Sequence, residues 1–142
     1  MKFATVLNTE ADKIWVNILN TQASALDEGD LVVWSTTSPD GARTIQPTTA
    51  TLSLLVGIAD DTIAASGYGL AQSYGYRATA LVTNATNANI AAGDILIPVN
   101  AVDYAARSAA SDGKTGFLFA GEAFASNATP AAAKKKVFLK CM

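Results

Sequence analysis

Hydrophobic and polar positions alternate with a period of two along several short stretches of the chain, which is the pattern of half-buried strands. The first stretch is Ile14–Leu19, and a β-rich run follows at Leu31–Trp34. Turn-forming residues come next at Pro39–Gly41. We therefore predict that Ala42–Gln46 returns as the second strand of a hairpin.

More short apolar runs follow, and Gly or Asp flanks most of them. They are Leu52–Val56, Tyr68–Tyr76, Arg77–Val82, Ile95–Ile97, Phe117–Phe119 and Val137–Leu139. Many short strands separated by regular turn signals predict an all-β domain, either a sandwich or a barrel. Two alanine-rich stretches, Ala101–Ala110 and Ala128–Lys136, have residues suited to a helix, and the pattern leaves their conformation open.

The chain also repeats itself at an offset of 64 residues, without a gap. Gly29–Asp30 matches Gly93–Asp94, and Gly57 matches Gly121 at the same offset. We interpret these six residues as structural turns, because glycine permits a positive φ or a close approach of two backbones.

The repeat predicts two related β units, in which the region 20–65 returns as 84–129. Each unit would be small and no linker separates them, so we predict one domain over 13–142. The repeat also weighs against a helix at 101–110, because the matching segment carries Pro39 and Gly41.

The composition is unusually apolar for a chain without a membrane segment. Half of the residues are hydrophobic, only 15% are charged and the net charge is −2. No apolar run approaches the roughly 18 residues that cross a bilayer. We therefore expect no membrane partner and no nucleic-acid partner, and we expect other protein to cover part of the surface.

The residue types available exclude several kinds of catalysis. The chain has no histidine, which rules out Ser-His-Asp and Cys-His nucleophiles and imidazole metal ligands. Its single cysteine, Cys141, forms no intrachain disulfide, which fits maturation in a reducing cytoplasm. No nucleophile-elbow motif is present. We predict that the protein is not an enzyme and needs no cofactor.

Several charged and aromatic residues could have either a structural or a binding role. The acidic residues Asp27, Glu28, Asp30 and Asp60–Asp61 offer oxygen ligands for calcium, but we interpret them as solvated turns and predict no metal site. The triplet Lys134–Lys136 is interpreted as a solvated segment. Tyrosine and tryptophan suit both core edges and interfaces, so we name four as interface candidates. They are Trp34, Tyr68, Tyr74 and Tyr76.

A family resemblance covers about positions 25–140 and consists of small and apolar residues. Its segments are Val56–Asp60, Ala64–Gly75, Ala80–Val82, Ile90–Leu96, Gly113–Lys114, Gly121–Ala123 and Val137–Leu139. This succession resembles the capsid cement, or head-decoration, proteins of tailed bacteriophages.

The resemblance implies a compact β-barrel or β-tulip domain without catalysis. It implies a protein made in the cytoplasm of a bacterial host that binds the outer surface of the capsid, as a homotrimer, and bridges major capsid protein subunits. It also implies an extended N-terminal arm, here 1–12, in which Phe3 is a further interface candidate.

Two other functions remain open on the sequence. One is a different virion component, such as a tail-tube or fibre-base subunit. The other is a carbohydrate-binding β-sandwich, in which Trp34, Tyr74 or Tyr76 would stack on sugar rings.

Overall fold

The computed structural model describes residues 12–37, 40–84, 89–108, 117–125 and 132–141. These residues form nine strands and no helix, so the predicted all-β class is confirmed. The strands are β1 (Ile14–Asn20), β2 (Leu31–Trp34), β3 (Arg43–Ile45), β4 (Leu55–Ala59), β5 (Tyr68–Thr83), β6 (Ile95–Pro98), β7 (Ala105–Arg107), β8 (Leu118–Ala120) and β9 (Ala132–Lys140). The predicted arm, Phe3 included, lies outside the described residues apart from Asp12.

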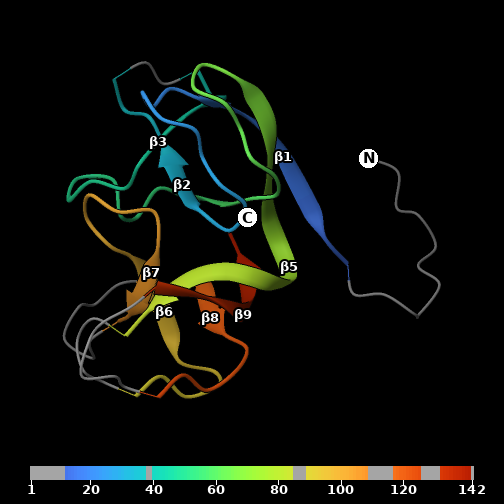
Figure 1. Ribbon diagram of the computed structural model, residues 1–142, viewed down its shortest axis with the longest axis vertical. Coiled ribbons are helices and arrows are strands. Elements are labelled where there is room, and N and C mark those ends of the chain that lie inside the picture. Colours follow the sequence, from blue (N-terminus) through green and yellow to red (C-terminus); the bar gives the residue numbers. More distant parts are fainter. Residues whose placement is uncertain (1–11, 38–39, 85–88, 109–116, 126–131, 142) are drawn as a thin grey trace.

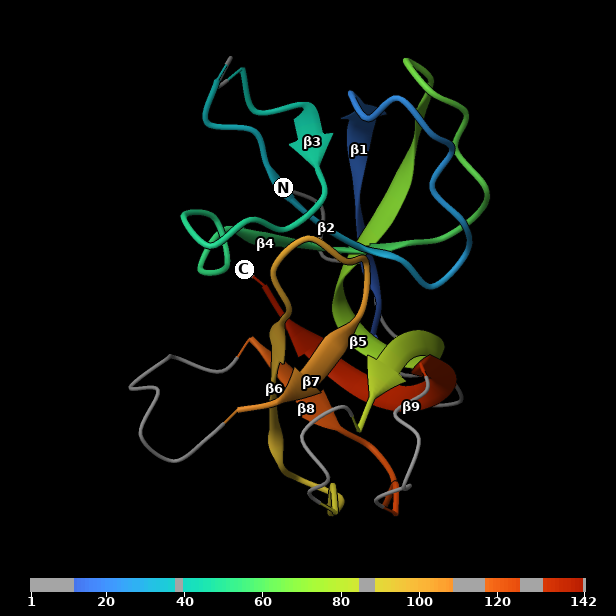
Figure 2. The ribbon, with the colours of Figure 1, turned by 60° about the vertical axis from the view of Figure 1, so that its left-hand side comes forward.

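Strand β5 is shared by two closed rings of strand pairings (Figures 1 and 2). The first ring runs β1-β3-β2-β4-β5 and closes because β1 also pairs with β5. The second runs β5-β7-β6-β8-β9 and closes because β9 also pairs with β5. We call the first ring, with the start of β5, the first lobe, and the second ring, with the end of β5, the second lobe.

The pairing of β1 with the start of β5 has the same register as the pairing of the end of β5 with the start of β9. Leu19 lies opposite Tyr68 in the first lobe, and Thr83 lies opposite Ala132 in the second, each 64 positions later. One pair of strands is parallel in each lobe, β1 with β3 and β5 with β7. The lobes are therefore structurally equivalent units, built in the same strand order.

The turn before β2 is built in the same way as the turn before β6. Gly29 has a φ of 101° and Gly93 a φ of 90°, a region that residues with a Cβ rarely occupy. The carboxylate of Asp30 accepts the Asp27 N–H at 2.7 Å, and the carboxylate of Asp94 accepts the Ala91 N–H at 2.9 Å. In each turn a glycine adopts the positive φ, and the carboxylate of the following aspartate accepts a backbone N–H from the start of the turn.

The predicted match of Gly57 with Gly121 does not hold. The Ala59 N–H donates to the Asp30 carbonyl and the Ala120 N–H donates to the Asp94 carbonyl, so the offset between β4 and β8 is 61. The segment from Asp94 to Ala120 in the second lobe is three residues shorter than the segment from Asp30 to Ala59 in the first. Gly57 lies where β4 passes close to β5, and a Cβ there would collide with the Gln72 carbonyl.

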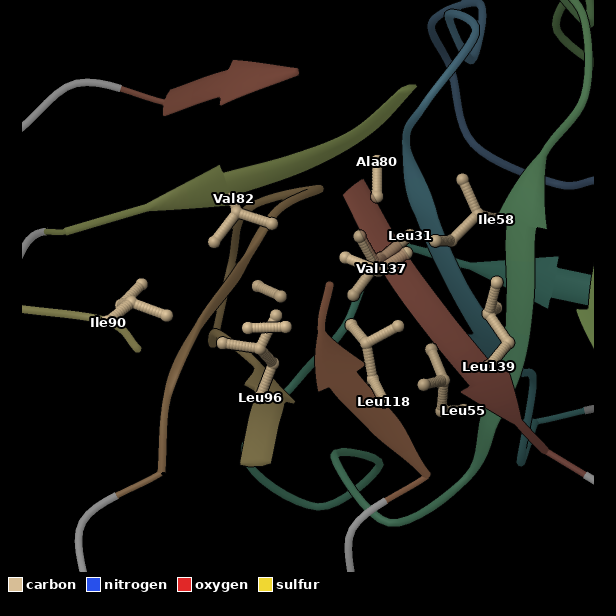
Figure 3. Close-up of a cluster of buried hydrophobic side chains, with 12 residues drawn as sticks. Leu31, Leu55, Ile58, Ala80, Val82, Ile90, Leu96, Leu118, Val137 and Leu139 are labelled. Carbon is tan, nitrogen blue, oxygen red and sulfur yellow. The ribbon is translucent and has the colours of Figure 1, made fainter. Parts of the chain in front are cut away.

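A continuous core joins the lobes (Figure 3). The first lobe encloses its own cluster, which contains Ile18, Leu26, Val32, Val56, Ala59, Ile63 and Ala71. The larger cluster fills the second lobe and also takes in Leu31, Leu55 and Ile58 from β2 and β4 of the first. The second lobe therefore packs against the outer surface of the first, and burial of these large side chains stabilises the contact.

The structure corrects some predicted strand limits. Within the predicted strand Leu52–Val56, β4 begins only at Leu55. The residues before it form two turns, in which the Thr51 N–H donates to the Thr48 carbonyl and the Leu54 N–H donates to the Thr51 carbonyl. The runs predicted as two strands on either side of Tyr76 form the single strand β5. Within the alanine-rich stretches, the described parts include β7 and the start of β9, where cross-strand pairing overrides the helical propensity of alanine.

Candidate interaction surfaces

A row of large apolar side chains crosses four neighbouring strands of the second lobe. Ile95 of β6 lies opposite Phe119 of β8, Phe119 opposite Phe138 of β9, and Phe138 opposite Tyr76 of β5. Residues directly opposite each other point to the same face of a sheet, so these four form one line. Ile95, Phe138 and Tyr76 are 38–40% exposed and Phe119 is half-buried. We call this line the aromatic row.

Tyr74 extends the aromatic row along β5. Its ring meets the ring of Phe138 edge to face, with the centroids 5.6 Å apart and the planes at 74°. This geometry is the preferred one for a pair of aromatic rings. The contact holds Phe138 in place on the surface, so the row is a fixed apolar feature rather than a set of independent side chains.

A second apolar surface lies on the first lobe, where β1 pairs with the start of β5. Tyr68 is 68% exposed, Leu70 is 49% exposed and Trp15 is 42% exposed. The register places Trp15 diagonally next to Leu70, and Leu70 is two residues from Tyr68 on the same face. We call Trp15, Leu70 and Tyr68 the β1–β5 patch.

Trp34 lies apart from both surfaces. It packs against the core cluster of the first lobe and lines a pocket of about 310 Å³. The other lining residues are Ser35, Thr36, Gly41, Arg43 and Leu54. Arg43 also pairs with Asp40 at 2.9 Å. Trp34 is therefore a core-edge residue beside a small, mostly apolar pocket.

A buried arginine links the lobes at the middle of β5. The side chain of Arg77 is only 5% exposed. Its guanidinium donates to the Asp60 carboxylate at 2.6 Å and to the Ala59 carbonyl at 2.9 Å, and lies 3.5 Å from the Glu28 carboxylate. Glu28 also accepts from Lys134 of β9 at 2.9 Å, and this hydrogen bond lowers the pKa of Glu28. Glu28 and Asp60, two of the residues considered as calcium ligands, therefore have a structural role in this network.

The remaining charged and nucleophilic candidates are also held in structural contacts. Lys135 lies 4.5 Å from the centre of the Phe124 ring, and the lysine triplet belongs to β9. Burial raises the pKa of Cys141 to about 12, so its thiol stays protonated at neutral pH. Among the described residues, no group of three or more histidine, cysteine, aspartate or glutamate side chains is placed to hold a metal ion.

Two partly buried carboxyl groups lie near each other where the turn before β2 meets the segment before β7. Asp103 accepts a hydrogen bond from the Gln46 amide at 3.0 Å, and its backbone carbonyl accepts the Leu31 N–H at 2.8 Å. Burial raises the pKa of Asp103, and it raises the pKa of Asp30 with a further contribution from the Asp103 charge. Ionisation at these positions therefore opposes folding.

We expect Asp103→Asn to stabilise the protein at pH 7 but to have little such effect at pH 3. A carboxyl group with a raised pKa binds its proton more tightly in the folded state than in the unfolded state. Its ionisation therefore costs no stability below the pKa of the unfolded state, and the cost appears as pH rises through the pKa of the folded state. Asparagine keeps an oxygen for the Gln46 amide. Urea unfolding of both proteins at the two pH values measures the difference, and an equal effect at both would contradict the assignment.

Of the interface candidates, Tyr74 and Tyr76 come together at the aromatic row, Tyr68 lies in the β1–β5 patch, and Trp34 is separate. Phe3 is not among the described residues. The sequence pattern does not identify Ile95, Phe119 and Phe138 as surface residues. Each sits in an uninterrupted apolar run, and such a run does not reveal which face is buried.

In the described parts of the chain, no helix has the length and apolar character needed to cross a membrane. No protein family matches the sequence, and no curated protein matches it either.

Proposed function

We propose that this protein is a capsid decoration protein of a tailed bacteriophage, which binds the outer surface of the shell and bridges major capsid protein subunits. The observation that carries the proposal is the number of large apolar side chains that remain exposed, in the aromatic row and in the β1–β5 patch, on a small chain of low charge. Contiguous apolar surface of this kind marks contact with other proteins. The resemblance of the sequence to head-decoration proteins supplies the identity of the partner.

A bridging protein needs one surface for the shell and another for its neighbours. We assign the β1–β5 patch to the shell, because Tyr68 and Leu70 are the most exposed large apolar side chains among the described residues. Several such contacts in one assembly reinforce each other, since each additional contact is effectively intramolecular. The resulting clamp would stabilise the shell against the pressure of packaged DNA without contact with the DNA.

The proposed fold is compatible with this role. We propose that each closed ring of five strands is a small barrel, which makes the molecule a tandem of two β-tulip-like units. Closed rings leave few free strand edges, so the protein can be present at high local concentration without edge-to-edge aggregation. The buried Arg77 network and the shared core would keep the two surfaces at a constant distance.

We expect the double variant Tyr68→Thr/Leu70→Thr to bind bare expanded capsids at least about tenfold more weakly than the wild type, because large apolar anchors carry most of the binding energy of an interface. Co-sedimentation of purified protein with capsids measures the affinity. The matched control is Ala132→Thr, since Ala132 occupies in the second lobe the position of Tyr68 in the first.

Wild-type protein should also raise the temperature at which the capsids rupture. Absence of wild-type binding at micromolar concentration would overturn the proposal. Open polymerisation into tubes would instead identify a tail-tube subunit. Binding to a glycan array that Trp34→Ala abolishes would identify a carbohydrate-binding module that uses the pocket beside Trp34.

A further inference from the structure

Strand β9 carries four lysines and no acidic residue, although the chain as a whole has a net charge of −2. Successive side chains of a strand point to opposite faces. The exposed face of β9 presents, in order, Lys134, Lys136, Phe138 and Lys140. Three of the four lysines are therefore on the same face as Phe138, which belongs to the aromatic row.

Two of the four lysines already have partners inside the chain. The Lys134 ammonium group lies 2.9 Å from the Glu28 carboxylate of the first lobe. Lys135, on the other face of the strand, lies 4.5 Å from the centre of the Phe124 ring. These two lysines are accounted for by the fold itself.

Lys136 and Lys140 have no such partner. Within the described residues, no carboxylate forms an ion pair with either of them. The Glu122 carboxylate accepts the Lys136 backbone N–H at 3.0 Å but is not paired with its ammonium group. The two lysines lie two residues before and two residues after Phe138, so their Cα atoms are about 13 Å apart along the strand. Each end of this exposed apolar feature therefore has an unpaired positive charge.

We propose that the aromatic row, together with Lys136 and Lys140, binds an acidic and apolar segment of a second major capsid subunit, next to the subunit that the β1–β5 patch contacts. The identity of this partner rests on the proposed function, and its chemistry follows from charge complementarity. An apolar side chain of the segment covers Phe138, and carboxylates on both sides of it pair with the two lysines. Covering the rings excludes water, which strengthens the attraction between the charges.

An acidic polypeptide suits this surface better than a nucleic acid does. Proteins that bind nucleic acid make many phosphate contacts and present an extended basic surface. Here two unpaired lysines lie beside a line of large apolar side chains, on a chain of net negative charge. Aromatic residues at the centre and charged residues at the rim are the usual arrangement of a contact between proteins.

The test measures co-sedimentation with bare expanded capsids at low and high salt for the wild type and for Lys136→Gln/Lys140→Gln. At about 50 mM NaCl the variant is expected to bind about tenfold more weakly than the wild type. At about 500 mM NaCl the difference should fall below about threefold, because salt screens the charges that the wild type retains.

Two further variants serve as controls. Lys135→Gln removes the same charge from the other face of the same strand, so it should bind as tightly as the wild type at both salt concentrations. Tyr68→Thr/Leu70→Thr should weaken binding by a similar factor at both, since the β1–β5 patch is apolar. The lysine substitutions are at exposed positions of β9, so the variants retain the fold.

A second measurement identifies the contact directly. A water-soluble carbodiimide joins an amine to a carboxylate when the two are in contact. Treatment of decorated capsids, followed by mass spectrometry, should give amide cross-links from Lys136 and Lys140 to aspartate or glutamate of the major capsid protein, and none from Lys135.

Three outcomes would overturn the inference while leaving the proposed function intact. The first is a lysine variant that binds capsids as tightly as the wild type at low salt. The second is cross-linking of Lys136 and Lys140 only to another copy of this chain. The third is retardation of single-stranded DNA by the wild type but not by the lysine variant, which would assign the surface to nucleic acid. Failure of the wild type to bind capsids would overturn both proposals.

Discussion

Replacing Arg77 with alanine is expected to destabilise the fold by about 3–5 kcal/mol, because truncation of a buried ion pair leaves its partners without compensation. The side chain is 5% exposed and serves the Asp60 carboxylate and the Ala59 carbonyl together. A loss at the lower end is expected, since the Asp60 side chain is 39% exposed and water can replace part of its interaction. For a chain of this size, the melting temperature should fall by roughly 10 °C.

Arg43→Ala is the matched control for this prediction. Arg43 also pairs with an aspartate, Asp40, but both side chains are close to half exposed. Its removal should change the unfolding midpoint very little, because exposed ion pairs contribute little to stability. A double-mutant cycle of Arg77→Ala with Asp60→Ala should then show a positive coupling energy. An Arg77→Ala protein as stable as Arg43→Ala would show that the network is incidental to the fold.

Leu31→Ala is expected to cost about 3 kcal/mol of stability, while Ile95→Ala, at the equivalent position of the second lobe, should cost well under half of that. Leu31 is completely buried in the core that joins the lobes, and Ile95 is 38% exposed. Loss of a buried side chain removes its transfer free energy and leaves a cavity, whereas an exposed side chain is replaced by water. Urea unfolding of both variants measures the difference.

Strands whose limits depend on local signals could be predicted. Leu31–Trp34 was predicted with the limits that β2 has, because an apolar run there is bounded by Gly29–Asp30 before it and turn residues after it. The hairpin of β2 with β3 followed from the same turn. The first strand was predicted to within one residue, from alternation alone. In each case, neighbouring residues in the sequence carry the whole signal.

Features that depend on distant pairing could not be predicted. Nothing near Tyr76 indicates that β5 continues through both lobes, because the strand is held by β1 and β4 at one end and by β9 at the other. The burial of Arg77 likewise depends on Glu28, Asp60 and Lys134, which are far apart in the sequence. The two parallel pairs, β1–β3 and β5–β7, have no local signal either.

The sequence by itself determined that the chain is built from short strands and glycine turns, and it contains the 64-residue offset that relates the two lobes. Only the tertiary structure decided which face of each apolar run is covered. Leu31 and Ile95 are equivalent residues of similar size, yet one is in the core and the other on the surface. The difference arises because the second lobe packs on the first, and exposure is a property of that packing rather than of either residue.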